Sequence, residues 1–161
     1  MKDARAIIRE HGPMIARIAS SYEASRAEQD ELVQDIFLAV WRAASAYRGD
    51  APMRAYIARI AHNVAVSHVR RSVRRKAAPL DDDHIDETAN PEADADRALK
   101  RRRLLAAIRT LDLPQRQAIT LHLEGFGNTE IADVLGLSPN AVAARLKRAR
   151  TTLADMMKAR P

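Results

Sequence analysis

The sequence of 161 residues predicts an all-α fold made of two small helical domains. Apolar residues recur at helical spacing in nearly every periodic segment, and no segment shows the strict alternation of a half-buried strand. Aromatic residues make up only 4% of the chain and Cys is absent, so the core must be built mainly from aliphatic side chains. That composition suits helical bundles better than β-sandwiches.

An acidic stretch divides the chain into two basic blocks. Residues 81–96 hold eight Asp and Glu and no Lys or Arg, whereas residues 1–80 hold 14 Lys and Arg against 8 acids and residues 97–161 hold 13 against 5. With two prolines and few apolar residues, the stretch at 79–96 is interpreted as an acidic flexible linker. It separates an N-terminal domain at 1–78 from a C-terminal domain at 97–161. Basic blocks of this kind indicate a polyanionic partner.

The first clear helix is expected from Arg26 to Ala44. Its broad apolar face is formed by Leu32, Val33, Ile36, Phe37, Val40 and Trp41. Trp41 closes this stripe and is expected in the core or at the domain edge. The opposite face carries, at spacings of three and four residues, Glu31, Gln34, Asp35 and Leu38.

A loop, "YRGDAP" at 47–52, precedes the next helix. This helix is expected to begin at Pro52, since proline suits the first position of a helix, and to run to about Arg75. Its inner stripe is expected to contain Met53, Ile57, Ile60, Ala61 and Val64. Its outer face becomes cationic toward the C-terminal end and contains Arg59, Asn63, Ser67, Arg70 and Arg74. Taken alone, this face is more typical of a solvated surface whose charges suit the helix dipole.

The C-terminal half predicts four further helices. One runs over 98–111 and the next starts at Pro114. Asn128 is expected to cap a short helix that ends at Gly136, where a left-handed residue is needed. Ser138 then caps the last helix, with a proline at its first position.

The spacing around Gly136 is that of a helix-turn-helix. The inner stripe of the last helix is formed by Val142, Leu146, Ala149 and Leu153. The side chains expected to face DNA are Ser138, Asn140, Ala141, Ala144, Arg145, Lys147, Arg148 and Arg150. Short residues at the start of such a helix suit base edges, and cations suit bases and phosphates. The pattern therefore favours DNA binding.

Other chemistry finds little support in the sequence. His62 and His68 do not share a helical face, and His68 is expected to be packed, so we predict no metal site. We also predict no cofactor and no catalytic residue, because the sequence offers no phosphate-binding loop, nucleophile motif or paired catalytic carboxylates. No apolar run approaches a membrane span and the N-terminus lacks a signal-peptide core, so a cytoplasmic protein without membrane insertion is expected.

Three segments resemble the extracytoplasmic-function group of bacterial sigma factors, in the sigma-70 family. "DELVQDIFLAVWR" (30–42) is similar to region 2.2, and "YRGDAPMRAYIARIAHNVAVSHVRR" (47–71) is similar to regions 2.3 and 2.4. The segment from Leu113 to Leu153 is similar to region 4. The resemblance covers nearly the whole chain, and it departs from the usual pattern at Ala143 and Ala144, where members often carry Lys and Ser.

This resemblance implies a factor that binds core RNA polymerase and directs promoter recognition and melting, in a stress or envelope response. The face of Glu31, Gln34, Asp35 and Leu38 would dock on the clamp of the largest subunit. The −10 element would be met by Arg48, Asp50, Arg59, Asn63, Ser67, Arg70, Arg71 and Arg74. The −35 element would be met by the last-helix residues given above. Region 4 would also reach the flap of the second-largest subunit, and an anti-sigma factor would be a further partner.

Two alternatives remain open from the residues. A sigma-like adaptor could sequester an anti-sigma factor without binding promoters, and the two alanines at 143 and 144 leave room for it. A helix-turn-helix repressor could instead bind duplex DNA as a dimer. The polar face of the helix at 26–44 and the lack of a dimerisation segment argue against the repressor.

Overall fold

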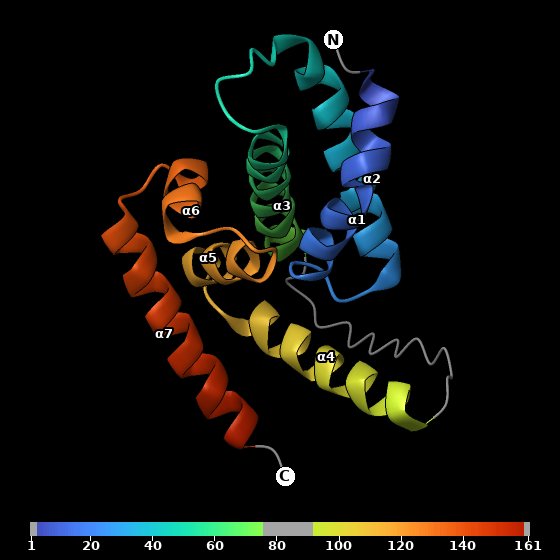
Figure 1. Cartoon of the computed structure of the whole chain (residues 1–161). Coiled ribbons are helices and arrows are strands. Elements are labelled where there is room, and N and C mark those ends of the chain that lie inside the picture. Colours follow the sequence, from blue (N-terminus) through green and yellow to red (C-terminus); the bar gives the residue numbers. More distant parts are fainter. Residues whose placement is uncertain (1–2, 76–91, 160–161) are drawn as a thin grey trace.

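The computed structural model describes residues 3–75 and 92–159, and within these ranges the chain is helical with no strand (Figure 1). The predicted all-α class is therefore confirmed. The part of the expected linker at 79–91 lies outside the described residues. Its last residues, 92–96, already belong to a helix, so the linker prediction was wrong there.

Three helices form the N-terminal bundle: α1 (Ala4–Ser20), α2 (Arg26–Ala43) and α3 (Met53–Arg75), each packed against the other two. A short 3-10 helix, η1 (Ala44–Ala46), follows α2. Helix α1 was not among the predicted helices. It begins where the Asp3 side chain accepts a hydrogen bond from the Arg5 N–H, and it tolerates Pro13 in its interior. The fully buried centre of this bundle comprises Ile15, Ile18, Leu32, Ile36 and Ile57.

Helix α2 follows the predicted pattern along most of its length. The Ser25 hydroxyl caps it by accepting from the Glu28 N–H at 3.1 Å. Leu32, Ile36 and Val40 are buried as predicted. Trp41, expected in the core or at the domain edge, lies at the edge, because 52% of this residue is exposed.

Four helices form the C-terminal bundle: α4 (Glu92–Thr110), α5 (Leu113–Leu123), α6 (Asn128–Leu135) and α7 (Pro139–Lys158). Helix α7 packs against the other three. Helix α4 begins at Glu92 rather than at the predicted 98. Its early residues, from Ala95 to Arg103, are exposed on all sides, so apolar periodicity could not mark its beginning.

The turn between α6 and α7 has the predicted form. Gly136 is left-handed, with φ 69° and ψ 39°, and the Ser138 hydroxyl accepts from the Ala141 N–H at 3.1 Å. The inner stripe of Val142, Leu146, Ala149 and Leu153 is buried, as expected. The cap of α6 differs from the prediction, because Gly127 is the N-cap and Asn128 is already the first helical residue.

The two bundles touch. Helix α3 lies against α5 and α6, so the C-terminal bundle rests on the side of the N-terminal one (Figure 1). Helix α7 lies on the far side of α5 and α6 from α3, at the outer edge of the molecule.

Candidate polymerase and nucleic-acid interfaces

The outer face of α2 combines acidic and apolar side chains. Glu31, Gln34 and Leu38 are exposed, and Asp35 is half-exposed beside His68, with 3.9 Å between its Oδ2 and the imidazole Nδ1. Leu38 is 49% exposed, which is high for a large aliphatic residue in a bundle with an apolar core. All four predicted docking residues are therefore accessible to a partner.

Trp41 extends this face. It lies three residues after Leu38, so the two side chains are neighbours on the helix surface. The sequence analysis expected Trp41 in the core or at the domain edge because its helical angle fits the edge of the buried stripe. The bundle ends before covering it, and Leu38 three positions earlier is the signal that could have assigned it to the outer face. We name Glu31, Gln34, Asp35, Leu38 and Trp41 the α2 face.

The outer face of α3 is polar and cationic throughout. Exposed side chains along it are Arg59, Asn63, Ser67, Arg70, Arg71 and Arg74. Because Ile57, Ala61 and Ala65 on the inner side are completely buried, the register of the helix fixes which residues face outward. This row of cations can contact phosphates, and the shorter Asn63 and Ser67 between them can reach base edges.

The loop before α3 is held in shape by two tyrosines. Tyr47 donates a hydrogen bond to the Ala51 carbonyl at 2.5 Å, and Tyr56 donates to the Ala43 carbonyl at 3.1 Å. The two rings lie 5.0 Å apart. Gly49, with φ 82°, supplies the left-handed turn. Arg48 and Asp50 are both exposed on this loop, so the two predicted residues are presented on a braced support.

Helix α7 presents its predicted residues on one side of the molecule. Ser138, Asn140, Ala144, Lys147, Arg148 and Arg150 are exposed, while Ala141 and Arg145 are half-buried. Arg150 is restrained, because its Nη2 lies 3.1 Å from Nε2 of His122 in α5. An arginine can only donate, so the His122 Nε2 is the acceptor in this contact.

His62 and His68 of α3 both have polar partners outside that helix. His62 is 1% exposed, and its Nδ1 lies 2.6 Å from the hydroxyl of Tyr22. Burial lowers the pKa of His62 to about 3 and raises that of Tyr22, so both are neutral near pH 7.

His68 pairs with a carboxylate that sequence spacing did not indicate. Its Nε2 lies 3.2 Å from Oε1 of Glu23, a buried residue just after α1. The two residues are far apart in sequence, so no helical periodicity connects them. His68 is thus largely buried, as expected, and it contacts a buried carboxylate.

Neither a membrane-spanning helix nor a metal-binding cluster is found in the described residues. Within residues 3–75 and 92–159 no helix is long and apolar enough to cross a membrane. In the same ranges no three His, Cys, Asp or Glu side chains are gathered as a metal ion would need.

Comparison with known proteins assigns the chain to a family. The model described as sigma-70 region 2 matches residues 7–75, and the one described as sigma-70, region 4 matches residues 101–153. The chain therefore belongs to the sigma-70 family. We call the bundle of α1–α3 region 2 and the bundle of α4–α7 region 4.

Individual relatives place it more closely. The RNA polymerase sigma factor CnrH of Cupriavidus metallidurans is 32% identical over 163 residues, which cover 95% of this chain and 85% of CnrH. The ECF RNA polymerase sigma factor SigM of Mycobacterium tuberculosis is 28% identical over 152 residues, 94% of this chain and 75% of SigM. The protein is an extracytoplasmic-function sigma factor that directs transcription.

Solved structures agree with this fold. The structure of CnrH in complex with the cytosolic domain of CnrY superposes with a TM-score of 0.71 at 29% identity, covering 98% of this chain and 89% of that one. The sigma factor RpoE in complex with the anti-sigma factor NepR, from Bartonella quintana, gives a TM-score of 0.73 at 20% identity over both whole chains. At that identity the second similarity shows the fold alone.

Proposed function

We propose that the α2 face is the surface on which this sigma factor docks to the clamp of the largest polymerase subunit. The observation that carries the proposal is the pair Leu38 and Trp41, two large apolar side chains left exposed on an otherwise polar helix face. An aromatic and an aliphatic anchor surrounded by polar residues is typical of a protein interface. A face that met only solvent would gain nothing from them.

The cationic faces of α3 and α7 bind different elements of the promoter. The outer face of α3, with Arg48 and Asp50 of the braced loop, meets the −10 element. Helix α7 meets the −35 element through the residues from Ser138 to Arg150. The supporting observation is that every predicted reader is exposed or half-buried, and that a buried stripe on the other side of α3 and of α7 fixes the register of those on the two helices.

The remaining partners follow from the same family placement. Region 4 reaches the flap of the second-largest polymerase subunit, and the protein acts in the cytoplasm, as a regulator rather than an enzyme. Regulation by an anti-sigma factor is supported by CnrH, whose solved structure holds the cytosolic domain of CnrY. The exposed cations on α3 and α7 favour promoter binding over the role of an adaptor that only sequesters such a regulator.

The test joins polymerase binding to transcription. In Gln34→Arg/Leu38→Arg, both changes lie on exposed positions of the α2 face. We expect this variant to keep its helical content, to lose binding in a titration with core polymerase, and to lose transcription from templates selected in a promoter library. The control Ala6→Arg/Ala24→Arg adds the same two charges at other exposed positions of region 2 and should behave as wild type. Unchanged affinity of the first variant for core polymerase would contradict the docking assignment.

A further inference from the structure

A hydrogen bond between α5 and α7 holds one of the cations expected to face DNA. Nη2 of Arg150 in α7 donates to Nε2 of His122, in the last turn of α5, over 3.1 Å. Arg150 is exposed and His122 is half-buried. The other cations of the same set make no side-chain hydrogen bond or ion pair within the described residues, and these are Arg145, Lys147 and Arg148. Arg150 therefore differs from its neighbours in being restrained by the protein itself.

The backbone on both sides of this contact is fixed by the core. Leu121, next to His122, and Ala149, next to Arg150, are both completely buried. Helices α5 and α7 pack against each other along this boundary. Apolar contacts thus set the distance between the two helices, so that the hydrogen bond mainly restrains the side chain of Arg150.

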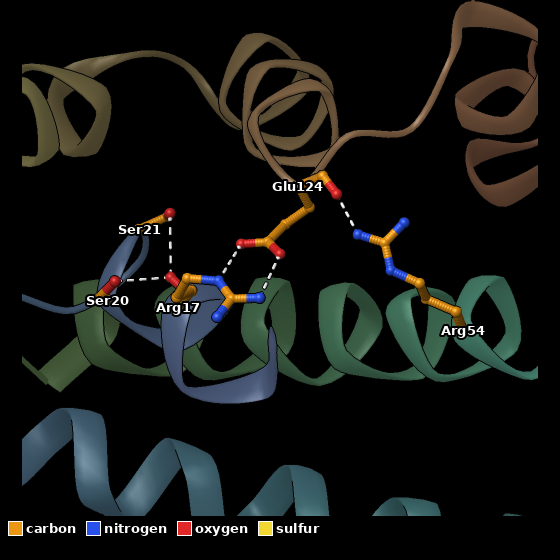
Figure 2. A network of polar contacts seen from close by, with 5 residues as sticks. All are labelled: Arg17, Ser20, Ser21, Arg54 and Glu124. Atoms are coloured by element: carbon orange, nitrogen blue, oxygen red, sulfur yellow. Dashed lines mark hydrogen bonds and ion pairs between the residues drawn. The ribbon is translucent and has the colours of Figure 1, made fainter. Parts of the chain in front are cut away.

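The chain just beyond His122 is fixed as well. The Glu124 carboxylate accepts two hydrogen bonds from the Arg17 guanidinium, from Nε to Oε1 at 2.8 Å and from Nη2 to Oε2 at 2.9 Å (Figure 2). On the other side of Glu124, Arg54 donates to its backbone carbonyl (Figure 2). A bidentate pair of this kind restrains both position and orientation. His122 is thus presented from a support that is anchored two residues away.

Arg150 lies on the flank of α7. At about 100° per residue it stands roughly 110° from the centre of the outer face, whereas Ala144 and Thr151 lie within about 10° of that centre. A helix in the major groove points its outer face at the base edges and its flanks at the sugar–phosphate backbone on either side. The Arg150 guanidinium is therefore placed for a phosphate rather than for a base.

The hydrogen bond leaves most of the Arg150 guanidinium available to DNA. An arginine has several N–H donors in one plane, and the contact with His122 uses only one of them. The remaining donors can bind the free oxygens of a phosphate in a fork. An arginine loses much rotamer freedom when it binds, and a partner within the protein that already holds it lowers this loss. His122 can therefore strengthen a contact that it does not itself make.

Resting on the −35 contact of α7 proposed above, we propose that His122 is a positioning residue for DNA binding. It holds the Arg150 guanidinium at the flank of α7, where this group binds a backbone phosphate of the −35 duplex. His122 itself touches no DNA, so its effect on binding passes entirely through Arg150. Because a phosphate contact carries no sequence information, the effect is the same on every promoter sequence.

The first experiment examines the free protein without polymerase or DNA. Nitrogen-15 NMR relaxation of the arginine side chains measures how far each Nε–H bond is ordered. We expect a higher order parameter for Arg150 than for Arg148 in the wild type, and similar values for the two after His122→Leu. His122→Gln places an amide oxygen close to the position of Nε2 and should keep Arg150 ordered. An order parameter of Arg150 that His122→Leu leaves unchanged would overturn the proposal.

The second experiment measures binding of the full chain with core polymerase to a promoter duplex selected from a library, at two salt concentrations. We expect His122→Leu to weaken binding about fivefold and Arg150→Ala about tenfold, with His122→Gln within about twofold of the wild type. Adding His122→Leu to Arg150→Ala should cause no further loss, because the histidine then has no arginine to hold. Arg150→Ala should also make the salt dependence shallower, whereas His122→Leu should leave its slope unchanged.

Two control variants change other positions of the same helices. Gln117→Leu replaces another half-buried polar residue of α5, and Lys158→Ala removes an exposed cation near the end of α7, so both should bind as the wild type does. A further loss when His122→Leu is added to Arg150→Ala would overturn the proposal, since His122 would then act through packing. Failure of the wild type on every library template would refute the proposed function, and the NMR comparison would still decide whether His122 restrains Arg150.

Discussion

Helices α2 and α7 have the same construction and different outer faces. Each buries a stripe spaced at three or four residues and begins at a serine cap. On α2 the outward side chains are acidic and apolar, with Leu38 and Trp41 exposed, whereas on α7 they are short near the start and cationic farther on. The difference teaches that the buried stripe determines where a helix sits, while the outward residues determine what it binds. The α2 face suits a protein surface, and α7 suits DNA.

The largest effect that would sharpen this comparison is expected at Trp41. Replacing Trp41 with Ala should weaken binding to core polymerase by about 2 kcal/mol or more, roughly 30-fold in Kd, because it removes an aromatic anchor from the proposed docking surface. Binding of α7 to an isolated −35 duplex should stay the same. Fluorescence anisotropy titrations measure both. Leu123→Ala removes another exposed apolar side chain and serves as the control, and equal losses in the two variants would deny Trp41 a special role.

A slightly smaller loss of binding free energy is expected for the contact between α7 and the −35 element. Arg148 is exposed near the centre of the outer side of α7, and Arg148→Ala should weaken binding to the −35 element by roughly 1–3 kcal/mol if it pairs with a guanine. The loss should then shrink on a duplex mutated at that base.

Lys147→Ala offers the contrast, since a phosphate contact is lost equally on every sequence and makes the salt dependence shallower. Titrations at two salt concentrations on matched and mutated duplexes separate the two cases. A loss for Arg148→Ala that is the same on all duplexes would reassign this arginine to the phosphates.

Lowering the pH should destabilise region 2 more than region 4, because region 2 contains the buried His62. Because the pKa of His62 is lowered to about 3 in the folded chain and is near 6.5 when unfolded, the unfolded chain binds a proton between these values that the folded chain does not. Stability therefore falls as pH drops below about 6.5, by up to about 1.4 kcal/mol per pH unit from this group.

His62→Gln keeps an acceptor for the Tyr22 hydroxyl and removes the titration. Urea unfolding between pH 7 and pH 5, followed by probes in each region, should show a shallower pH dependence for this variant, with the difference largest in region 2. A parallel pH profile for wild type and variant would show that His62 is solvated.

The smallest effect concerns the two serine caps. Ser25→Ala and Ser138→Ala each remove a hydroxyl that accepts a backbone N–H at 3.1 Å, so each should lower the free energy of unfolding by about 1 kcal/mol. Only Ser138→Ala should also weaken binding to the −35 duplex, because Ser138 lies on the side of α7 that we propose meets DNA. Chemical denaturation and duplex titration on both variants give the comparison. An equal effect of both changes on DNA binding would argue that Ser138 acts through folding alone.

Sequence reasoning succeeded where the information is local. The stripe of α7, the left-handed Gly136 and the cap at Ser138 all follow from spacing within one or two turns. Helix α1 was not predicted, and Pro13 in its interior removes a hydrogen-bond donor and argues against a helix there. The fold class needed only the period of the apolar residues, which tertiary packing did not override.

What sequence reasoning missed depends on contacts between distant segments. His68 finds Glu23 across the bundle, and Arg17 finds Glu124 across the two regions. The residues of each pair are too far apart in sequence for helical spacing to predict the contact. Trp41 fits the edge of the apolar stripe by angle, and its exposure follows from where the neighbouring helices end. The spacing of residues within one helix predicts which of them share a face. Contacts between residues of different helices can be identified only in the folded structure.

The braced loop before α3 has an energetic consequence. Tyr47 closes the loop by donating to the Ala51 carbonyl, and Tyr56 of α3 holds the end of α2 by donating to the Ala43 carbonyl. Little conformational entropy therefore remains for the segment from Arg48 to Ala51 to lose when a partner arrives. If this loop meets an unpaired base, the nucleic acid does the bending and unstacking while the protein stays rigid. Selectivity then depends on how easily each DNA sequence deforms, in addition to any hydrogen bond that the loop makes.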